Sequence, residues 1–105
     1  MSIIIEYQND NKLYYFNSLN EINNYDKVVY IYCSGNDLTL LPELPNSLQE
    51  LWCNNNQLTS LPELPNSLKY IYCMKNNLTE LPELPNSLIQ LDCWNNKLMK
   101  KRQYK

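Results

Sequence analysis

The chain has 105 residues, of which 44% are hydrophobic and 11% aromatic, and this composition is too apolar for a disordered segment. Its net charge of −2 provides no broad positive field, so nucleic acid and membrane surfaces are not expected partners. The chain also contains no histidine, which excludes histidine-dependent catalytic triads and histidine metal ligands.

Residues 1–27 predict an N-terminal cap made of a hairpin and a short helix. Apolar residues alternate over 3–7, a turn-like stretch follows, and residues 13–16 are again strand-like, which favours a β-hairpin. Ser18 and Glu21 have the spacing of a capping box and favour a helix of one or two turns. The N-terminus has neither a basic region nor a long apolar run, so we expect an intracellular protein without a signal peptide.

A twenty-residue unit dominates the chain from residue 28 to residue 98. Copies start at Leu48, Leu68 and Leu88, the last of them incomplete, and a partial copy precedes them. Cysteines and asparagines recur at the same interval: Cys33, Cys53, Cys73, Cys93, Asn36, Asn56, Asn76 and Asn96. A fixed period of this length is typical of a solenoid, in which each unit makes one coil. Apolar residues alternate before each cysteine and predict strands at about 29–33, 49–53, 69–73 and 89–93, which we expect to form a short, curved parallel sheet.

The segment from Leu61 to Ser67, with its equivalents in the other units, returns the chain to the next strand. Pro62 and Pro65 exclude an α-helix there, so an extended or polyproline-like return on the convex side is expected. The asparagines are expected to form an internal ladder that satisfies turning backbone. The cysteines fall at inward positions without any Cys-x-x-Cys pair, so we expect free thiols in the core and neither a metal nor a cofactor.

The string Leu-Pro-x-Leu-Pro-x-Ser-Leu-x-x-Leu-x-x-x-x-Asn-x-Leu-Thr begins at Leu41. It resembles the leucine-rich repeat of bacterial type III secretion effectors, and the form with cysteine before asparagine resembles repeats encoded by giant DNA viruses. The resemblance covers residues 28–98 and implies a leucine-rich repeat solenoid of the α/β class, mostly β, with protein partners. Several such effectors carry a ubiquitin ligase domain after the repeats. Only a basic tail, residues 99–105, follows here, so we expect no such ligase domain. Since the chain has no histidine, and with one glycine no phosphate-binding loop, we expect no enzyme.

If Leu51 and Cys53 point inward, their neighbours in every coil face outward on the concave side. Each coil has three such outward positions, which makes twelve, and six of the twelve are aromatic. The candidate binding residues are Tyr30, Tyr32, Glu50, Trp52, Tyr70, Tyr72, Met74, Asp92 and Trp94. Exposed Tyr and Trp are typical of protein interfaces, so the sequence predicts a non-enzymatic module that binds a protein or peptide.

Three alternatives stay open for the aromatic face. The rings stabilise the sheet through cross-strand pairs. A homodimer buries either the rings or the open strand edge at the C-terminal end of the repeats. A carbohydrate stacks its sugar rings on the same side chains.

Overall fold

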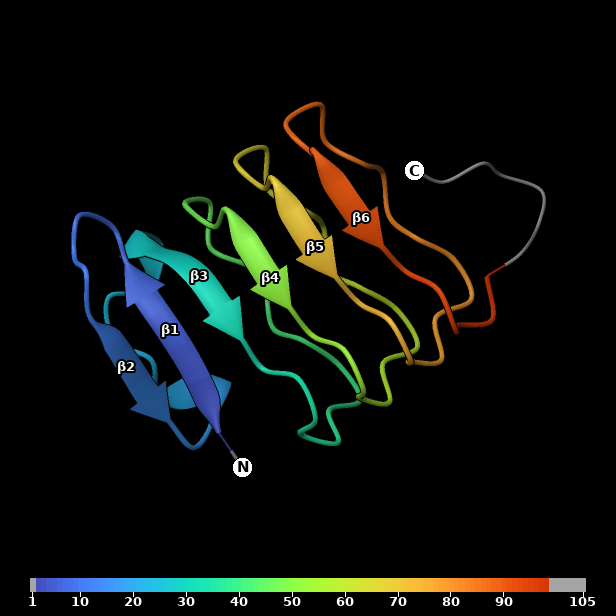
Figure 1. Ribbon diagram of the computed structural model, residues 1–105, viewed down its shortest axis with the longest axis horizontal. Helices are drawn as coiled ribbons and strands as arrows, with labels where there is room; N and C mark the ends of the chain where they lie inside the picture. Colours follow the sequence, from blue (N-terminus) through green and yellow to red (C-terminus); the bar gives the residue numbers. More distant parts are fainter. Residues whose placement is uncertain (1, 99–105) are drawn as a thin grey trace.

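The computed structural model describes residues 2–98, so the expected basic tail lies outside the described residues. Six strands form one open sheet in the order β2-β1-β3-β4-β5-β6 (Figure 1). They are β1 (Ile3–Tyr7), β2 (Leu13–Phe16), β3 (Val28–Tyr32), β4 (Glu50–Trp52), β5 (Tyr70–Tyr72) and β6 (Gln90–Asp92). The remaining elements are two single-turn 3₁₀ helices, η1 (Leu19–Glu21) and η2 (Tyr25–Lys27).

The four strands of the repeats run parallel and in register at an offset of twenty residues. Ile31 lies opposite Leu51, and Leu51 lies opposite Ile71. Beyond the strand the next amide continues the pattern, since Cys53 N donates to Tyr72 O at 2.8 Å. The strands β4 to β6 have three residues each and are shorter than the five residues expected, since each lacks one residue at either end.

The parallel pairing expected for the four repeat strands is confirmed, and the N-terminal hairpin, expected as a separate cap, joins the same sheet. Strand β1 pairs antiparallel with both β2 and β3, so the six-stranded sheet is mixed. Ile5 thereby lies opposite Ile31, and it is fully buried. The hairpin covers the strand edge that β3 would otherwise leave open.

The return segments, residues 41–47, 61–67 and 81–87, contain no helix and run behind the sheet (Figure 1). Each ends in a tight turn, in which Leu48 N donates to Pro45 O at 3.1 Å and Leu68 N donates to Pro65 O at the same distance. The Ser67 hydroxyl then donates to Leu48 O at the start of the same twenty-residue unit. These turns let seven residues replace the helix that the prolines exclude.

One hydrophobic core lies between the sheet and the return segments and extends from Ile3 to Leu91. The expected asparagine ladder is confirmed at its edge, where three of the four asparagines are buried: Asn36, Asn56 and Asn76. Asn56 Nδ2 donates to the carbonyls of Cys33 and Cys53, and its Oδ1 accepts from Leu38 N. Within residues 2–98, no buried side-chain nitrogen or oxygen lacks a hydrogen-bond partner.

The four cysteines are free thiols, as expected. Cys33, Cys53 and Cys73 are fully buried, whereas Cys93 in the last coil is half-buried. Burial raises the pKa of Cys33 and of Cys73 to about 12. These thiols therefore stay neutral and behave as small core hydrophobes.

The cap differs from expectation in its helical part. Ser18 Oγ accepts from Asn20 N, but Glu21 accepts from Asn17 N and not from the Ser18 amide of a regular capping box. The result is one 3₁₀ turn, and the second turn, η2, was not expected. Neither helix in residues 2–98 is long and apolar enough to cross a membrane.

Candidate functional site

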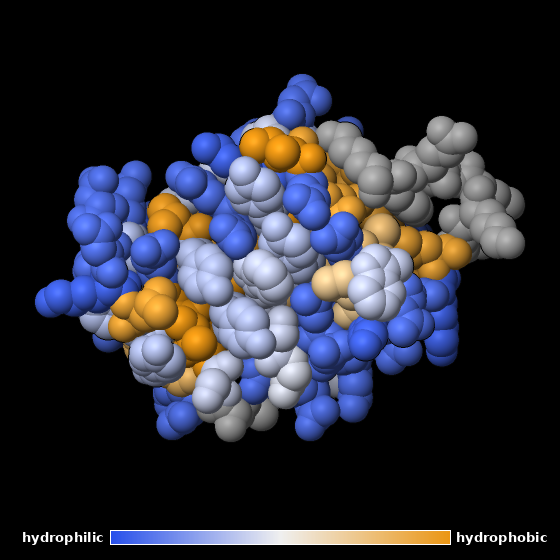
Figure 2. Space-filling view, in the orientation of Figure 1, coloured by the Kyte–Doolittle hydropathy of each residue, from blue (hydrophilic) through white to orange (hydrophobic). Residues whose placement is uncertain are grey.

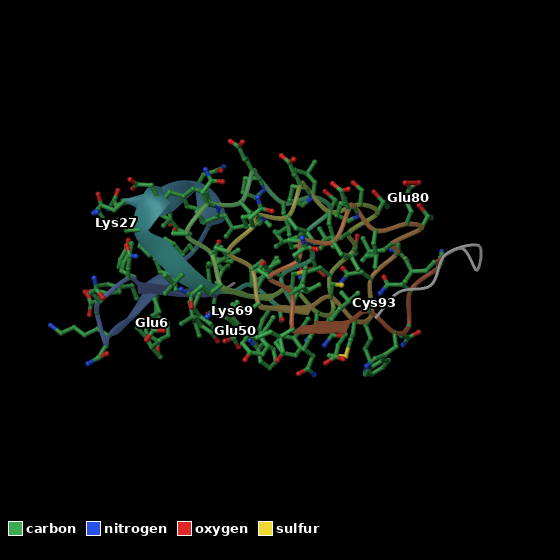
Figure 3. The ribbon with its side chains drawn as sticks, turned by 90° about the horizontal axis from the view of Figure 1, so that it is seen from above. Glu6, Lys27, Glu50, Lys69, Glu80 and Cys93 are labelled. Carbon is green, nitrogen blue, oxygen red and sulfur yellow. The ribbon has the colours of Figure 1, made fainter. Side chains whose placement is uncertain are left out.

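The repeat strands alternate between buried and half-exposed side chains. Leu51 and Cys53 are completely buried, while Trp52 between them is half-buried. We call the side of the sheet opposite the return segments the outer sheet face. Glu6 and Glu50 lie on that side, and Glu80 lies on the side of the return segments (Figure 3).

One row of the outer sheet face is an aromatic stack. Tyr32, Trp52 and Tyr72 occupy equivalent positions of adjacent strands, and Asp92 follows them on β6. The rings of Trp52 and Tyr72 are stacked, with centroids 4.1 Å apart and planes at 30°. Tyr32 and Trp52 are looser, with centroids 6.3 Å apart and planes at 37°. The row therefore offers a continuous aromatic surface over three strands, which ends at a carboxylate.

The second row mixes aromatic and acidic residues. Tyr30, Glu50 and Tyr70 lie in register, and Gln90 follows on β6. Glu50 Oε2 accepts from the indole Nε1 of Trp52 at 2.6 Å and so links the two rows. This bond holds the indole in one orientation on the exposed face.

The two remaining candidates, Met74 and Trp94, lie just past the ends of their strands. Met74 is half-buried, and its amide donates to Asn54 Oδ1 at 2.7 Å. Trp94 is 57% exposed, and the ammonium of Lys75 lies 5.7 Å from its ring centroid. Trp94 makes no ring–ring contact within residues 2–98, so it lies outside the stack.

The hairpin extends both rows, and this part of the face was missed from the sequence. Ile4 lies opposite Tyr32 on one side and Tyr15 on the other, so the row of the stack spans all six strands. Tyr15 is 67% exposed, and a hydrophobic patch is visible over the cap strands beside the paler aromatic region (Figure 2). Three consecutive isoleucines, residues 3–5, were the available signal, because one of them must point away from the core.

The tyrosines within residues 2–98 fall into two groups by their hydroxyls. The hydroxyls of the three half-buried cap tyrosines are bonded, since Tyr7 donates to Asn23 O, Tyr14 to Asp10 and Tyr25 to Glu43 O. The outer-face hydroxyls make no hydrogen bond with any other described residue: Tyr15, Tyr30, Tyr32, Tyr70 and Tyr72. The outer phenols are therefore free to bond with water or a ligand.

The electrostatic surroundings of these phenols are acidic. Partial burial, and then the carboxylate of Glu50, raises the pKa of Tyr30. Partial burial, followed by Glu50 and Asp92, raises the pKa of Tyr72. Across residues 2–98 no group of three histidine, cysteine, aspartate or glutamate side chains could hold a metal ion. The face thus combines aromatic planes with carboxylates.

Comparison with known proteins adds no family to these observations. No family model matches the chain, and no curated protein matches it. The candidate site therefore depends on the geometry of the outer sheet face.

Proposed function

We propose that the protein is a leucine-rich repeat solenoid whose outer sheet face binds a protein or peptide without enzymatic activity. The fold part of this proposal is supported by the constant step between parallel strands and by the buried asparagines at the same position of successive units. The four free thiols fit a reducing compartment inside a cell, which we include in the proposal.

The stack of Tyr32, Trp52 and Tyr72 carries the binding proposal. These rings lie half-exposed on a sheet face that no other described segment covers. Tyr and Trp provide large contact areas with few rotatable bonds, so they lose little conformational entropy when a partner covers them. The exposed Leu13 and Tyr15 enlarge the surface toward the cap.

Cross-strand stabilisation alone accounts for less of this surface. A ring pair such as Trp52 with Tyr72 stabilises a sheet by about 0.2–1 kcal/mol. That gain does not explain Tyr15, which is 67% exposed at the outermost strand and forms no ring pair within the described chain. A partner would cover Tyr15 and the stack together.

A homodimer through the C-terminal edge is a second candidate, favoured by the hydrogen bonds between coils. Cys73 N donates to Asp92 O and Lys75 N donates to Trp94 O, as in the earlier coils. The equivalent amides of the last coil, Cys93 and Asn95, have no acceptor within residues 2–98. Unpaired strand edges recruit other chains. Analytical ultracentrifugation over a wide concentration range distinguishes the homodimer from binding of another protein by the outer sheet face, because only the homodimer requires self-association.

The binding proposal is tested by the double variant Trp52→Ala with Tyr72→Ala. Leu40→Ala is the matched control, since Leu40 is 69% exposed and lies outside the sheet. Proteins captured by the wild-type chain would be identified by mass spectrometry, purified and titrated against all three chains. We expect the double variant to lose the interaction and the control to keep it.

Two results would refute that proposal. One is a purified partner that binds the double variant as tightly as the wild type, provided that circular dichroism shows both to be folded. The other is a glycan-array signal that disappears in the double variant in the absence of any protein partner, which would select the carbohydrate alternative.

A further inference from the structure

We infer that the segment bound by the outer sheet face is basic, a peptide that places arginine or lysine side chains between the aromatic rings and the carboxylates of this face. The inference deepens the proposed function and rests on it, because it names the chemistry of the partner. It depends on the arrangement of three acidic residues: Glu6, Glu50 and Asp92.

Each of these carboxylates lies next to an aromatic ring in the register of the sheet. Glu6 is opposite Tyr30, which is itself opposite Glu50, and Asp92 is opposite Tyr72 at the end of the stack. Adjacent strands are about 4.8 Å apart. A cation placed above such a pair can therefore contact a ring face and a carboxylate oxygen at once.

The carboxylates have acceptor capacity to spare. Glu50 uses Oε2 for the indole of Trp52, and Asp92 uses Oδ2 for Gln90 Nε2. Their second oxygens, and both oxygens of Glu6, accept no hydrogen bond within the described part of the chain. An arginine guanidinium fits this set best, since it is planar, stacks on aromatic rings and donates several parallel hydrogen bonds.

Among residues 2–98, no positively charged side chain lies within these rows. No lysine or arginine occupies an outward position on the six strands. The lysines nearest to the rows in sequence are Lys69, directly before β5, and Lys75, which lies against Trp94 beyond the strand. Partial burial first, and then the carboxylates of Glu50 and Asp92, raise the pKa of Tyr72. The face therefore attracts cations.

The test uses a random short-peptide library selected against the purified full chain, followed by titration of the enriched peptides. The double variant Glu50→Gln with Asp92→Asn removes two charges and retains amide oxygens that can accept from Trp52 and Gln90. Its control is Glu63→Gln with Glu83→Gln, which removes the same charge from exposed positions on the return segments. We expect enrichment of arginine and lysine. We also expect affinity about tenfold weaker in the first variant, from about two- to fivefold for each exposed ion pair, and little change in the control.

Each possible result decides the inference. If the affinity decreases when the salt concentration is raised from about 50 to about 300 mM, the inference is supported together with the variants, because salt screens exposed ion pairs. Equal weakening by both double variants overturns it, since net charge alone would then explain binding. Enriched peptides without basic residues that need Trp52 and Tyr72 overturn the basic class and leave the proposed function standing. A library that yields no enriched peptide also counts against the inference, while the pull-down still decides the proposed function.

Discussion

Asn76 holds the turn after β5 to the neighbouring coils. Its Oδ1 accepts from Leu58 N at 3.0 Å, and its Nδ2 donates to the carbonyls of Cys53 and Cys73. Each carbonyl also accepts from a second asparagine, Cys53 O from Asn56 and Cys73 O from Asn96. Leu58 N, in contrast, has Asn76 Oδ1 as its one acceptor among the described residues. One substitution therefore leaves a single buried amide unsatisfied.

We predict that Asn76→Ala lowers the free energy of unfolding by about 2–4 kcal/mol, from that amide and the weakened carbonyl bonds. Urea denaturation followed by circular dichroism measures the loss. Asn66→Ala is the control, because Asn66 is exposed on a return segment and the expected change is within about 0.5 kcal/mol. Equal midpoints for the two variants would show that the ladder contributes nothing to stability.

The buried thiols make stability depend on alkaline pH. Burial raises the pKa of Cys33 and Cys73 from 9.0 to about 12, so the native state keeps protons that the unfolded state releases. Stability from these groups is complete below pH 9 and is lost as the pH rises toward 12. Each thiol lowers the free energy of unfolding by about 1.4 kcal/mol per pH unit in that window.

We predict that the double variant Cys33→Ala with Cys73→Ala loses stability less steeply with pH than the wild type does. Urea unfolding under reducing conditions at several pH values above 9 measures the slope. Cys93→Ala should change it less, because Cys93 is only half-buried. A wild-type slope that neither variant alters would contradict the assignment to the core thiols.

At the scale of elements, β1 serves both faces of the sheet with adjacent isoleucines. Ile5 is fully buried opposite Ile31, and Ile4 is half-buried on the outer sheet face opposite Tyr32. We predict that Ile5→Ala destabilises the protein by about 2–4 kcal/mol, whereas Ile4→Ala costs less than about 1.5 kcal/mol. Thermal unfolding compares the two directly. Similar losses would mean that β1 does not separate core from surface in solution.

The elements of the repeats were predictable because every unit has the same pattern of apolar residues and prolines. A buried Leu51 and Cys53 with Trp52 between them follow from period-two alternation, and the prolines exclude a helix in the return segments. The cap was less predictable, since its hairpin occurs once. The sequence of residues 3–16 does not predict that the hairpin pairs with β3, because this pairing connects residues far apart in sequence.

The sequence predicted which residues of the repeats lie in the candidate site, but it did not predict the geometry of their side chains. The positions of Tyr32, Trp52 and Tyr72 follow from the twenty-residue period. Their ring angles and the bond from Trp52 to Glu50 depend on rotamers that no sequence pattern specifies. The extension through Ile4 and Tyr15 depended on the same long-range pairing as the cap.

At the scale of the whole molecule, the two ends of the sheet differ. The first repeat strand is covered by β1 and β2, which add antiparallel partners and the exposed Tyr15. The last strand, β6, pairs with β5 alone among the described residues. Between the ends each repeat unit contacts its neighbours through the same backbone bonds, such as Lys97 N to Leu78 O and Asn77 N to Leu58 O. Stability is then expected to increase with the number of coils.

This arrangement predicts that a further coil can be inserted without disturbing the rest. A second copy of residues 48–67 placed after Ser67 keeps the sequence in phase, because Leu48 then follows the serine as Leu68 does. We expect one cooperative unfolding transition at higher urea concentration, with an m-value about a fifth larger because more surface becomes exposed on unfolding. Inserting residues 48–57 alone puts the asparagine of one coil out of phase with the next and should destabilise the protein. If the full unit destabilises it equally, the repeats do not form the independent, stackable coils of a solenoid.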